Sequence, residues 1–347
     1  MSDHRLLYEA ADFPVFQNRM YDSPEAARAC PRGQIELVED LRSGLIYNAA
    51  FDPDLMVYDA EYQNEQAKSG PFRAHLDWAA DLVIDKMGKR LIEVGCGKGT
   101  FLEMLADRGA QITGFDPTYE GDDPRIEKVY FGPDLGLNAD GLVLRHVLEH
   151  IENPVSFLRQ LGEANSGGLI YIEVPCFDWI CDNRAWFDIF YEHVNYFRLS
   201  DFHKIFGRVV EAGHCFGGQY LYVVGDLSSL RDPAYDPTRR APFPADFTDT
   251  LAAANTTPQD VVWGGASKGL IYSMLRARAG RPVAGIVDIN PAKQGKYLAG
   301  TGLRVSAPDE MLPGLPDDTR ILVMNPNYTD EIKSMSGNRF TYVEVGA

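Results

Sequence analysis

Residues 91–101, which read LIEVGCGKGTF, decide the fold of the central part of this chain. An apolar run ends in a glycine-rich turn, and the apolar residues that follow from Phe101 have helical spacing. A second apolar run at residues 111–115 ends on Asp116. Glycine lets the backbone approach a ligand closely, and a new helix presents unpaired N–H groups at the turn. An acid after the second strand lies where ribose hydroxyls are bound at the carboxyl edge of a parallel sheet.

The spacing of the glycines separates two cofactors. A nicotinamide fingerprint requires G-x-G-x-x-G. Here Gly95, Gly97 and Gly99 give G-x-G-x-G, with Glu93 two residues upstream. This arrangement resembles the first motif of the methyltransferases that use S-adenosylmethionine (SAM), whose methionine ammonium favours a nearby carboxylate. We therefore predict that SAM is bound by these four residues and by Asp116. A nicotinamide site and a tight turn without ligand are the alternatives.

The composition indicates a soluble cytoplasmic enzyme. A chain of 347 residues with 45% hydrophobic content can form two or three domains. No apolar run approaches the roughly 18 residues of a membrane helix, and residues 1–13 are too polar for a signal peptide. The five cysteines are odd in number and lack C-x-x-C spacing, which favours a reducing compartment. The net charge of −17 argues against nucleic acid but allows an anionic small substrate.

Three segments follow one another along the chain. Residues 1–74 mix turns and short apolar runs, and residues 75–226 alternate strands with helices as a doubly wound sheet requires. A stretch rich in Pro, Asp and Arg at 231–244 reads as a linker. Residues 245–347 form a second alternating unit, whose GGASKG at 264–269 misses both the dinucleotide and the P-loop template. The expected fold is α/β, with a central class I SAM-methyltransferase sheet, a small N-terminal domain and a C-terminal Rossmann-like domain.

Three further motifs connect the chain to a family. They are VDINPAKQGKYLAGT at 287–301, RHVLEHI at 145–151 and FDIFYEHVNYF at 187–197. With the glycine turn, they resemble the SAM-dependent C-methyltransferases of deoxysugar biosynthesis over nearly the whole chain. The resemblance implies methyl transfer to a carbon beside a ketone of a nucleotide-linked sugar. Methylation of oxygen or nitrogen on a sugar or other metabolite, and a non-catalytic protein that binds SAM or sugar, are the alternatives.

The N-terminal segment departs from that family. Its members usually hold a zinc ion there through paired C-x-x-C motifs, the second of which runs into a glycine and a short apolar strand. With Gly44 as the anchor, the second pair of cysteines falls on Asp40 and Ser43, and Cys30 is alone. Structural zinc needs about four Cys or His ligands. We therefore predict no metal, and a domain that is held by packing alone.

Residues 146–150 read HVLEH, which matches the H-x-x-E-H pattern of a zinc protease. The motif follows an apolar run at 141–144, which reads as the fourth parallel strand of the sheet, and precedes Asn153. In many methyltransferases such a turn lies beside the cofactor and the substrate. We predict that His146 lines the cofactor pocket, with a protease site and a purely structural turn as the alternatives.

The catalytic candidates follow the apolar run at 169–175. Methylation of a carbon beside a ketone needs a base, and histidine has an ordinary pKa near neutral. His193 is predicted as that base, since it resembles the histidine of the family's Glu-His pair, and Glu192 would orient it. His146 and His150 are the alternative candidates for the base. The other alternative is that His193 only lines a buried wall and takes no part in the chemistry.

Two tyrosines complete the candidate site. Tyr62 resembles a family tyrosine that reaches into the active site, where its phenol would donate to the enolate oxygen. A surface tyrosine is the alternative. Tyr196, from the segment that carries the Glu-His pair, is the other candidate.

Overall fold

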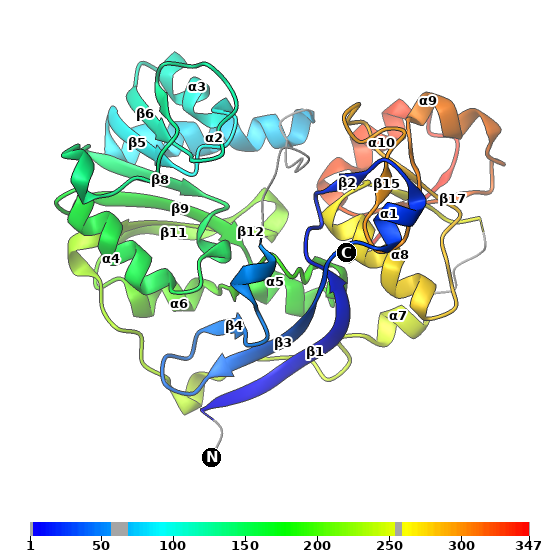
Figure 1. The fold of residues 1–347 in the computed structure, drawn as a ribbon, viewed down its shortest axis with the longest axis horizontal. Coiled ribbons are helices and arrows are strands. Elements are labelled where there is room, and N and C mark those ends of the chain that lie inside the picture. The colour runs from blue at the N-terminus through cyan, green and yellow to red at the C-terminus, as the bar shows by residue number, and fades with distance from the viewer. Residues whose placement is uncertain (1–2, 57–68, 254–258, 347) are drawn as a thin grey trace.

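The computed structural model describes residues 3–56, 69–253 and 259–346. Figure 1 shows a central part around a large sheet on the left, a C-terminal part on the right, and long N-terminal strands below them. Tyr62 lies outside the described residues, so its predicted role stays a prediction.

The central part is built on a sheet that has seven strands among the described residues. Five parallel strands carry an antiparallel pair at one edge, because β12 runs antiparallel to both β9 and β11. This arrangement confirms the expected doubly wound α/β sheet. The order is β11 (Val209–Cys215), β12 (Tyr220–Asp226), β9 (Leu169–Pro175), β8 (Gly141–Arg145), β5 (Arg90–Val94), β6 (Gln111–Phe115), β7 (Ile126–Glu127).

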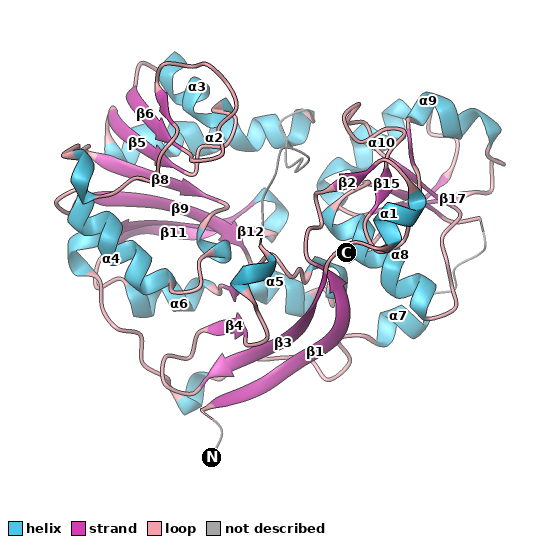
Figure 2. Cartoon of the chain, viewed as in Figure 1, coloured by secondary structure: helices cyan, strands magenta, loops and turns pink. Residues whose placement is uncertain are grey.

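Helices cover both faces of this sheet (Figure 2). One face carries α2 (Gly70–Met87) and α3 (Thr100–Asp107), and the other carries α4 (Pro154–Ala164) and α6 (Leu199–Ile205). The longest, α2, begins at Ser69, whose Oγ accepts the N–H of Phe72, and its apolar residues recur at helical spacing. No helix within the described ranges is long and apolar enough to cross a membrane.

The N-terminal part is an antiparallel sheet that includes one strand, β10, from the central part. Its order is β1 (His4–Pro14), β3 (Arg32–Asp40), β4 (Ile46–Asn48), β10 (Asn195–Tyr196). Because β10 begins two residues after His193, this pairing ties the predicted catalytic segment to the N-terminal sheet. The N-terminal part also holds β2 (Met20–Tyr21) and α1 (Pro24–Arg28).

The C-terminal part has a parallel sheet with the Rossmann order. The order is β16 (Val305–Ser306), β14 (Gly285–Val287), β13 (Val261–Trp263), β17 (Arg320–Val323), β18 (Thr341–Glu344). Its helices are α7 (Asp249–Ala253), α8 (Ser267–Arg278), α9 (Pro308–Met311) and α10 (Thr329–Met335). One further strand, β15 (Tyr297–Leu298), pairs with β2 of the N-terminal part.

The three parts share a hydrophobic core. One cluster of buried residues joins Ile35 of β3, Trp186 beside the short helix α5 (Phe177–Asp182), and Ile271 of α8. The predicted boundary at residue 74 lies within α2, so the central part begins before it. The N-terminal and C-terminal parts therefore pack through the loops that carry the candidate site.

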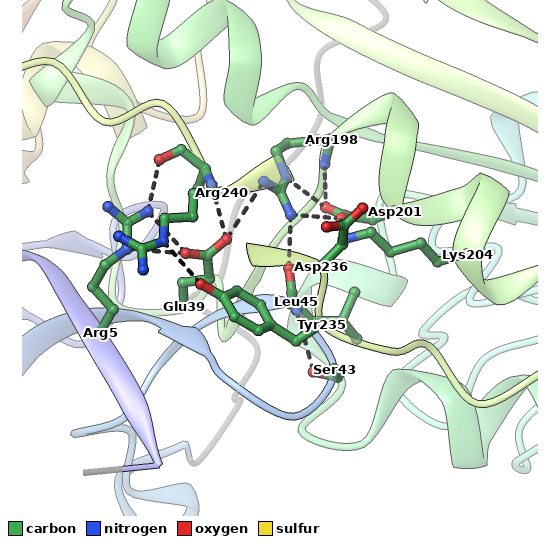
Figure 3. A network of polar contacts seen from close by, with 12 residues as sticks. Arg5, Glu39, Ser43, Leu45, Arg198, Asp201, Lys204, Tyr235, Asp236 and Arg240 are labelled. Atoms are coloured by element: carbon green, nitrogen blue, oxygen red, sulfur yellow. Dashed lines mark hydrogen bonds and ion pairs between the residues drawn. The ribbon is translucent and has the colours of Figure 1, made fainter. Parts of the chain in front are cut away.

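A polar network also stabilises the N-terminal part, which corrects the expectation of packing alone (Figure 3). Buried Glu39 accepts the Nε–H of Arg5 at 3.0 Å and the N–H of Ala241 at 2.8 Å. Arg198, also buried, donates to Asp201 at 2.7 Å and to a backbone carbonyl of the 40–45 turn. These are charge-assisted bonds, which are stronger than neutral ones.

At the two positions where the family has cysteines, the side chains bond to each other. The Oγ of Ser43 donates to Oδ2 of Asp40 at 2.6 Å, and the N–H of Arg42 donates to its Oδ1 at 3.0 Å. Some groups of His, Cys, Asp or Glu among the described residues lie close enough together to hold a metal ion, and neither Asp40 nor Cys30 belongs to any of them. The turn is closed by hydrogen bonds, and the absence of zinc stays a prediction.

Candidate active site

The glycine-rich turn joins β5 to α3 and needs its glycines. The φ angles of Gly95, Gly97 and Gly99 are +71°, +53° and +79°, in the left-handed region that favours glycine. A Cβ on Gly95 would lie 2.5 Å from Cγ2 of Val147, so the turn at 146–150 packs against this one. A Cβ on Gly97 would meet nothing within 4 Å among the described residues. The turn thus leaves room for a ligand at Gly97.

Asp116 follows β6 and holds that turn in place. Its Oδ2 accepts the N–H of Gly97 at 2.8 Å, and its Oδ1 accepts the N–H and Oγ–H of Thr118 at 2.9 and 2.7 Å. A carboxylate has about four acceptor positions. One therefore remains for a ribose hydroxyl, which leaves the predicted contact with SAM open.

Glu93 lies in β5 directly before the turn. It is 3% exposed, and its Oε2 has no hydrogen-bond partner among the described residues. Burial raises the pKa of Glu93 to about 8, although nearby Arg145 acts in the opposite direction. A buried carboxyl oxygen without a donor fits the ammonium group of SAM. The open space at Gly97 and the acceptor position left on Asp116 fit other parts of the same cofactor.

His146 sits between two carboxylates at the carboxyl end of β8. Its Nδ1 is 3.3 Å from Oε1 of Glu149 and its Nε2 is 3.2 Å from Oε1 of Glu173. Ionised carboxylates only accept hydrogen bonds, so both ring nitrogens donate and the ring is an imidazolium. Burial acts to lower the pKa of His146, but the two carboxylates outweigh it and raise the pKa to about 9. An imidazolium cannot accept a proton, so His146 is a weaker candidate for the base than its position in the sequence suggests.

Glu173 is the centre of a buried network that the sequence reasoning missed. It accepts from Arg145 at 2.8 Å, from His75 at 3.0 Å and from the hydroxyl of Tyr171 at 2.7 Å, in addition to His146. Burial acts to raise its pKa, but Arg145 and the histidines hold it well below the usual range. The available signal was an acid inside an apolar strand, since acids are rarely buried unless they are paired.

His193 lies in a second cluster with His150 and Glu149. The ring centroids of the two histidines are 5.0 Å apart, and one ligand atom from each of the three residues lies within 4.8 Å of the others. The Nδ1 of His150 donates to the carbonyl oxygen of Glu192 at 2.8 Å. Burial lowers the pKa of His193 to about 3, and His150 acts in the same direction. This corrects the expectation of a base with a pKa near neutral: His193 is neutral at working pH because it is desolvated.

The other two candidates of this segment hold its shape. Oε1 of Glu192 accepts the N–H of Gln17 at 2.7 Å, and Glu149 is the carboxylate that shares the cluster with His193. The hydroxyl of Tyr196 donates to the carbonyl of Phe190 and accepts its N–H, both at 2.9 Å. Both groups thus make loop-forming bonds, and their predicted parts in the chemistry stay predictions.

A cavity of about 200 Å³ lies where the C-terminal part meets the central part. Asp288 and Asn325 line it just after the carboxyl ends of β14 and β17, and Lys268 lines it from the first turn of α8. The sheet order reverses between β13 and β17, which is where such folds bind ligands. From the central part the lining includes Tyr220, whose ring is 4.6 Å from that of His146. The cavity therefore adjoins the histidine network.

Lys268 links the C-terminal part to the central part at this cavity. Its Nζ lies 2.8 Å from Oδ2 of Asp188 and 2.8 Å from Oε1 of Gln219, and 4.8 Å from the ring centroid of Trp179. All three partners belong to the central part. The segment 264–269, which fits no phosphate template and ends in the first turn of α8, thus contacts the central part through Lys268.

Comparison with known proteins addresses the central part most directly. Residues 64–209 match the family model described as "Methyltransferase domain". A ubiquinone biosynthesis O-methyltransferase from Aeromonas salmonicida (strain A449) is 30% identical over 116 residues, 28% of this chain, and the match spans about half (48%) of that relative. The C-methyltransferase NovU from Streptomyces niveus is 23% identical over 341 residues, covering 83% of this chain and 80% of NovU.

A solved structure of a SAM-dependent methyltransferase from Archaeoglobus fulgidus is 17% identical, with a TM-score of 0.35, and covers 45% of this chain and 96% of that one. The family match agrees with the sheet order and the glycine turn of residues 95–99. The central part of this chain is a SAM-dependent methyltransferase domain, and SAM is its cofactor.

Proposed function

We propose that the whole chain transfers a methyl group from SAM to a carbon beside a ketone of a nucleotide-linked sugar, with His193 as the base. The observation that carries the proposal is the cavity between the C-terminal part and the central part. It opens at the carboxyl ends of the C-terminal strands and borders Tyr220, which packs on His146. An acceptor held there would lie beside Tyr220, whose ring contacts that of His146.

The lining of the cavity suits a nucleotide-linked sugar. Asp288, Asn290 and Lys293 line it and belong to the 287–301 motif, the most specific part of the resemblance to sugar C-methyltransferases. Lys268 and Lys293 also line it, each paired with a carboxylate, Asp188 at 2.8 Å and Asp288 at 3.5 Å. The similarity to a C-methyltransferase, NovU, over most of both chains supports the same acceptor chemistry.

The chemistry assigns each group one task. His193 takes the acidic proton from the carbon beside the ketone. Because burial lowers its pKa, this step needs a neighbouring group that stabilises the imidazolium formed. The electron pair of that C–H bond passes into an enolate, whose carbon then forms the new bond to the methyl group. SAM, when bound, supplies that methyl as an electrophile, and the pair of the broken C–S bond stays on sulfur. Tyr62 is proposed as the donor to the enolate oxygen.

Methylation of oxygen is the second candidate, because the 30% identity of the central part is to an O-methyltransferase. The same base would serve a hydroxyl. The position of the new methyl group distinguishes the two reactions.

The test is incubation of the purified protein with methyl-labelled SAM and a panel of nucleotide-linked keto sugars, followed by NMR of the product. We expect the label on a carbon beside the ketone, and less transfer to the same sugars without the nucleotide. Label on oxygen, or no transfer to any keto sugar by a protein that binds SAM, would contradict the proposal.

A further inference from the structure

We propose that Glu149 is a positioning residue that stabilises the positive charge formed on His193 when that histidine takes the proton. The inference rests on the proposed function and adds a residue to it. Sequence reasoning assigned this part to Glu192, the neighbour of His193 in the chain.

The carboxylate of Glu149 lies close to His146, His150 and His193. Glu149 lies in the short 3-10 helix of residues Leu148–His150 and is 1% exposed. Its Oε1 bonds to Nδ1 of His146, while its Oε2 is buried with no hydrogen-bond partner among the described residues. Nδ1 of His193 is likewise buried and without a partner there. Ligand atoms of Glu149, His150 and His193 lie within 4.8 Å of one another.

The electrostatics around His193 call for such a group. The charged and titratable groups that act on it are His150, Glu149, His146 and Lys268. Three of these are cationic or become so on protonation, and a cation on buried His193 would also lose hydration. Of the four, only Glu149 supplies negative charge, so it offsets the cost of protonating His193.

Glu149 is held in the ionised form that this role requires. Burial acts to raise its pKa, but the hydrogen bond from His146 and the charges of His150 and His193 hold the pKa below the usual range. Because His146 already occupies one oxygen, the other remains for the cluster. The hydrogen bond with His146 thus favours the ionised form of Glu149.

Coulomb's law sets the size of the effect. Unit charges separated by the 4.8 Å limit of the cluster, at an effective dielectric constant of about 20, interact strongly enough to change a rate on the order of 10²-fold. Glu149→Gln keeps the shape and removes the charge, so it should slow proton removal by about that factor.

The experiment measures proton removal without methyl transfer. The protein with S-adenosylhomocysteine is mixed with the nucleotide-linked keto sugar in D₂O, and exchange of the acidic C–H is followed by NMR. We expect exchange on the order of 10²-fold slower in Glu149→Gln, recovery to within about tenfold of wild type in Glu149→Asp, and normal exchange in Glu152→Gln, which removes an exposed acid three residues away. SAM affinity, measured by calorimetry, should match wild type in all three variants.

The outcomes separate the two proposals. Equal exchange in wild type and Glu149→Gln would overturn the role of Glu149 alone, as would equal loss in Glu149→Gln and Glu149→Asp, which would indicate packing. A divalent metal ion that is bound by the wild type and lost in Glu149→Gln would also overturn it, since Glu149 would then be a ligand. No exchange in the wild type with any keto sugar would overturn the proposed function and this role with it.

Discussion

Replacing Asp116 with alanine tests how far one carboxylate serves both the fold and the cofactor. The structure gives it three hydrogen bonds, one from the partly buried N–H of Gly97 and two from exposed Thr118. A charge-assisted bond contributes about 1.5–3 kcal/mol, and exposed bonds contribute less. We expect Asp116→Ala to lower the free energy of unfolding by roughly 2–4 kcal/mol.

The same variant should weaken SAM binding by roughly 1–3 kcal/mol, because buried ribose hydroxyls lose an acceptor. This corresponds to about a 5-fold to 150-fold increase in Kd. Thr118→Val is the matched control: it removes the Oγ–H bond to Asp116 but leaves the carboxylate, so SAM affinity should stay near wild type. Calorimetry measures the affinity, and urea unfolding monitored by circular dichroism measures the stability. Unchanged SAM affinity in a folded Asp116→Ala protein would refute the reasoning.

Three further predictions concern the base, the cofactor acid and the metal. His193→Asn should keep SAM binding and lower turnover by roughly 10²–10⁴-fold. Because burial lowers the pKa of His193 to about 3, wild-type kcat should not fall with acidification near the ordinary histidine pKa of about 6.5. A fall in kcat near that pH would favour His150 as the base. Burial raises the pKa of Glu93 to about 8, and the ammonium group of bound SAM favours the ionised carboxylate. SAM affinity should therefore fall as pH drops below about 8, and Glu93→Gln should abolish that dependence. Calorimetry that finds the same pH dependence of affinity in both proteins would contradict this prediction. Elemental analysis should find no stoichiometric zinc and chelators should leave the melting temperature unchanged, because Asp40 and Ser43 bond to each other; about one zinc per chain would show the opposite.

The sequence by itself determined the backbone of the predicted cofactor site. Strand, glycine turn and helix at 91–107 are local, and the left-handed φ angles at Gly95, Gly97 and Gly99 are those that glycine alone adopts easily. Asp116 could be placed because parallel strands end at one edge of a sheet. The α/β class and the alternating C-terminal unit followed from the same periodicity.

Tertiary structure decided the rest of the site, because its contacts join residues far apart in the chain. Glu192 bonds to Gln17 across 175 positions, so its side chain cannot be assigned to His193 from adjacency. Side chains of neighbouring residues in an extended segment point to opposite sides. Glu149 reaches the cluster through the fold, and the pKa of His193 depends on burial that no local pattern encodes. The cavity is lined by residues of two parts of the chain, which Lys268 joins through Asp188, and only packing specifies that contact.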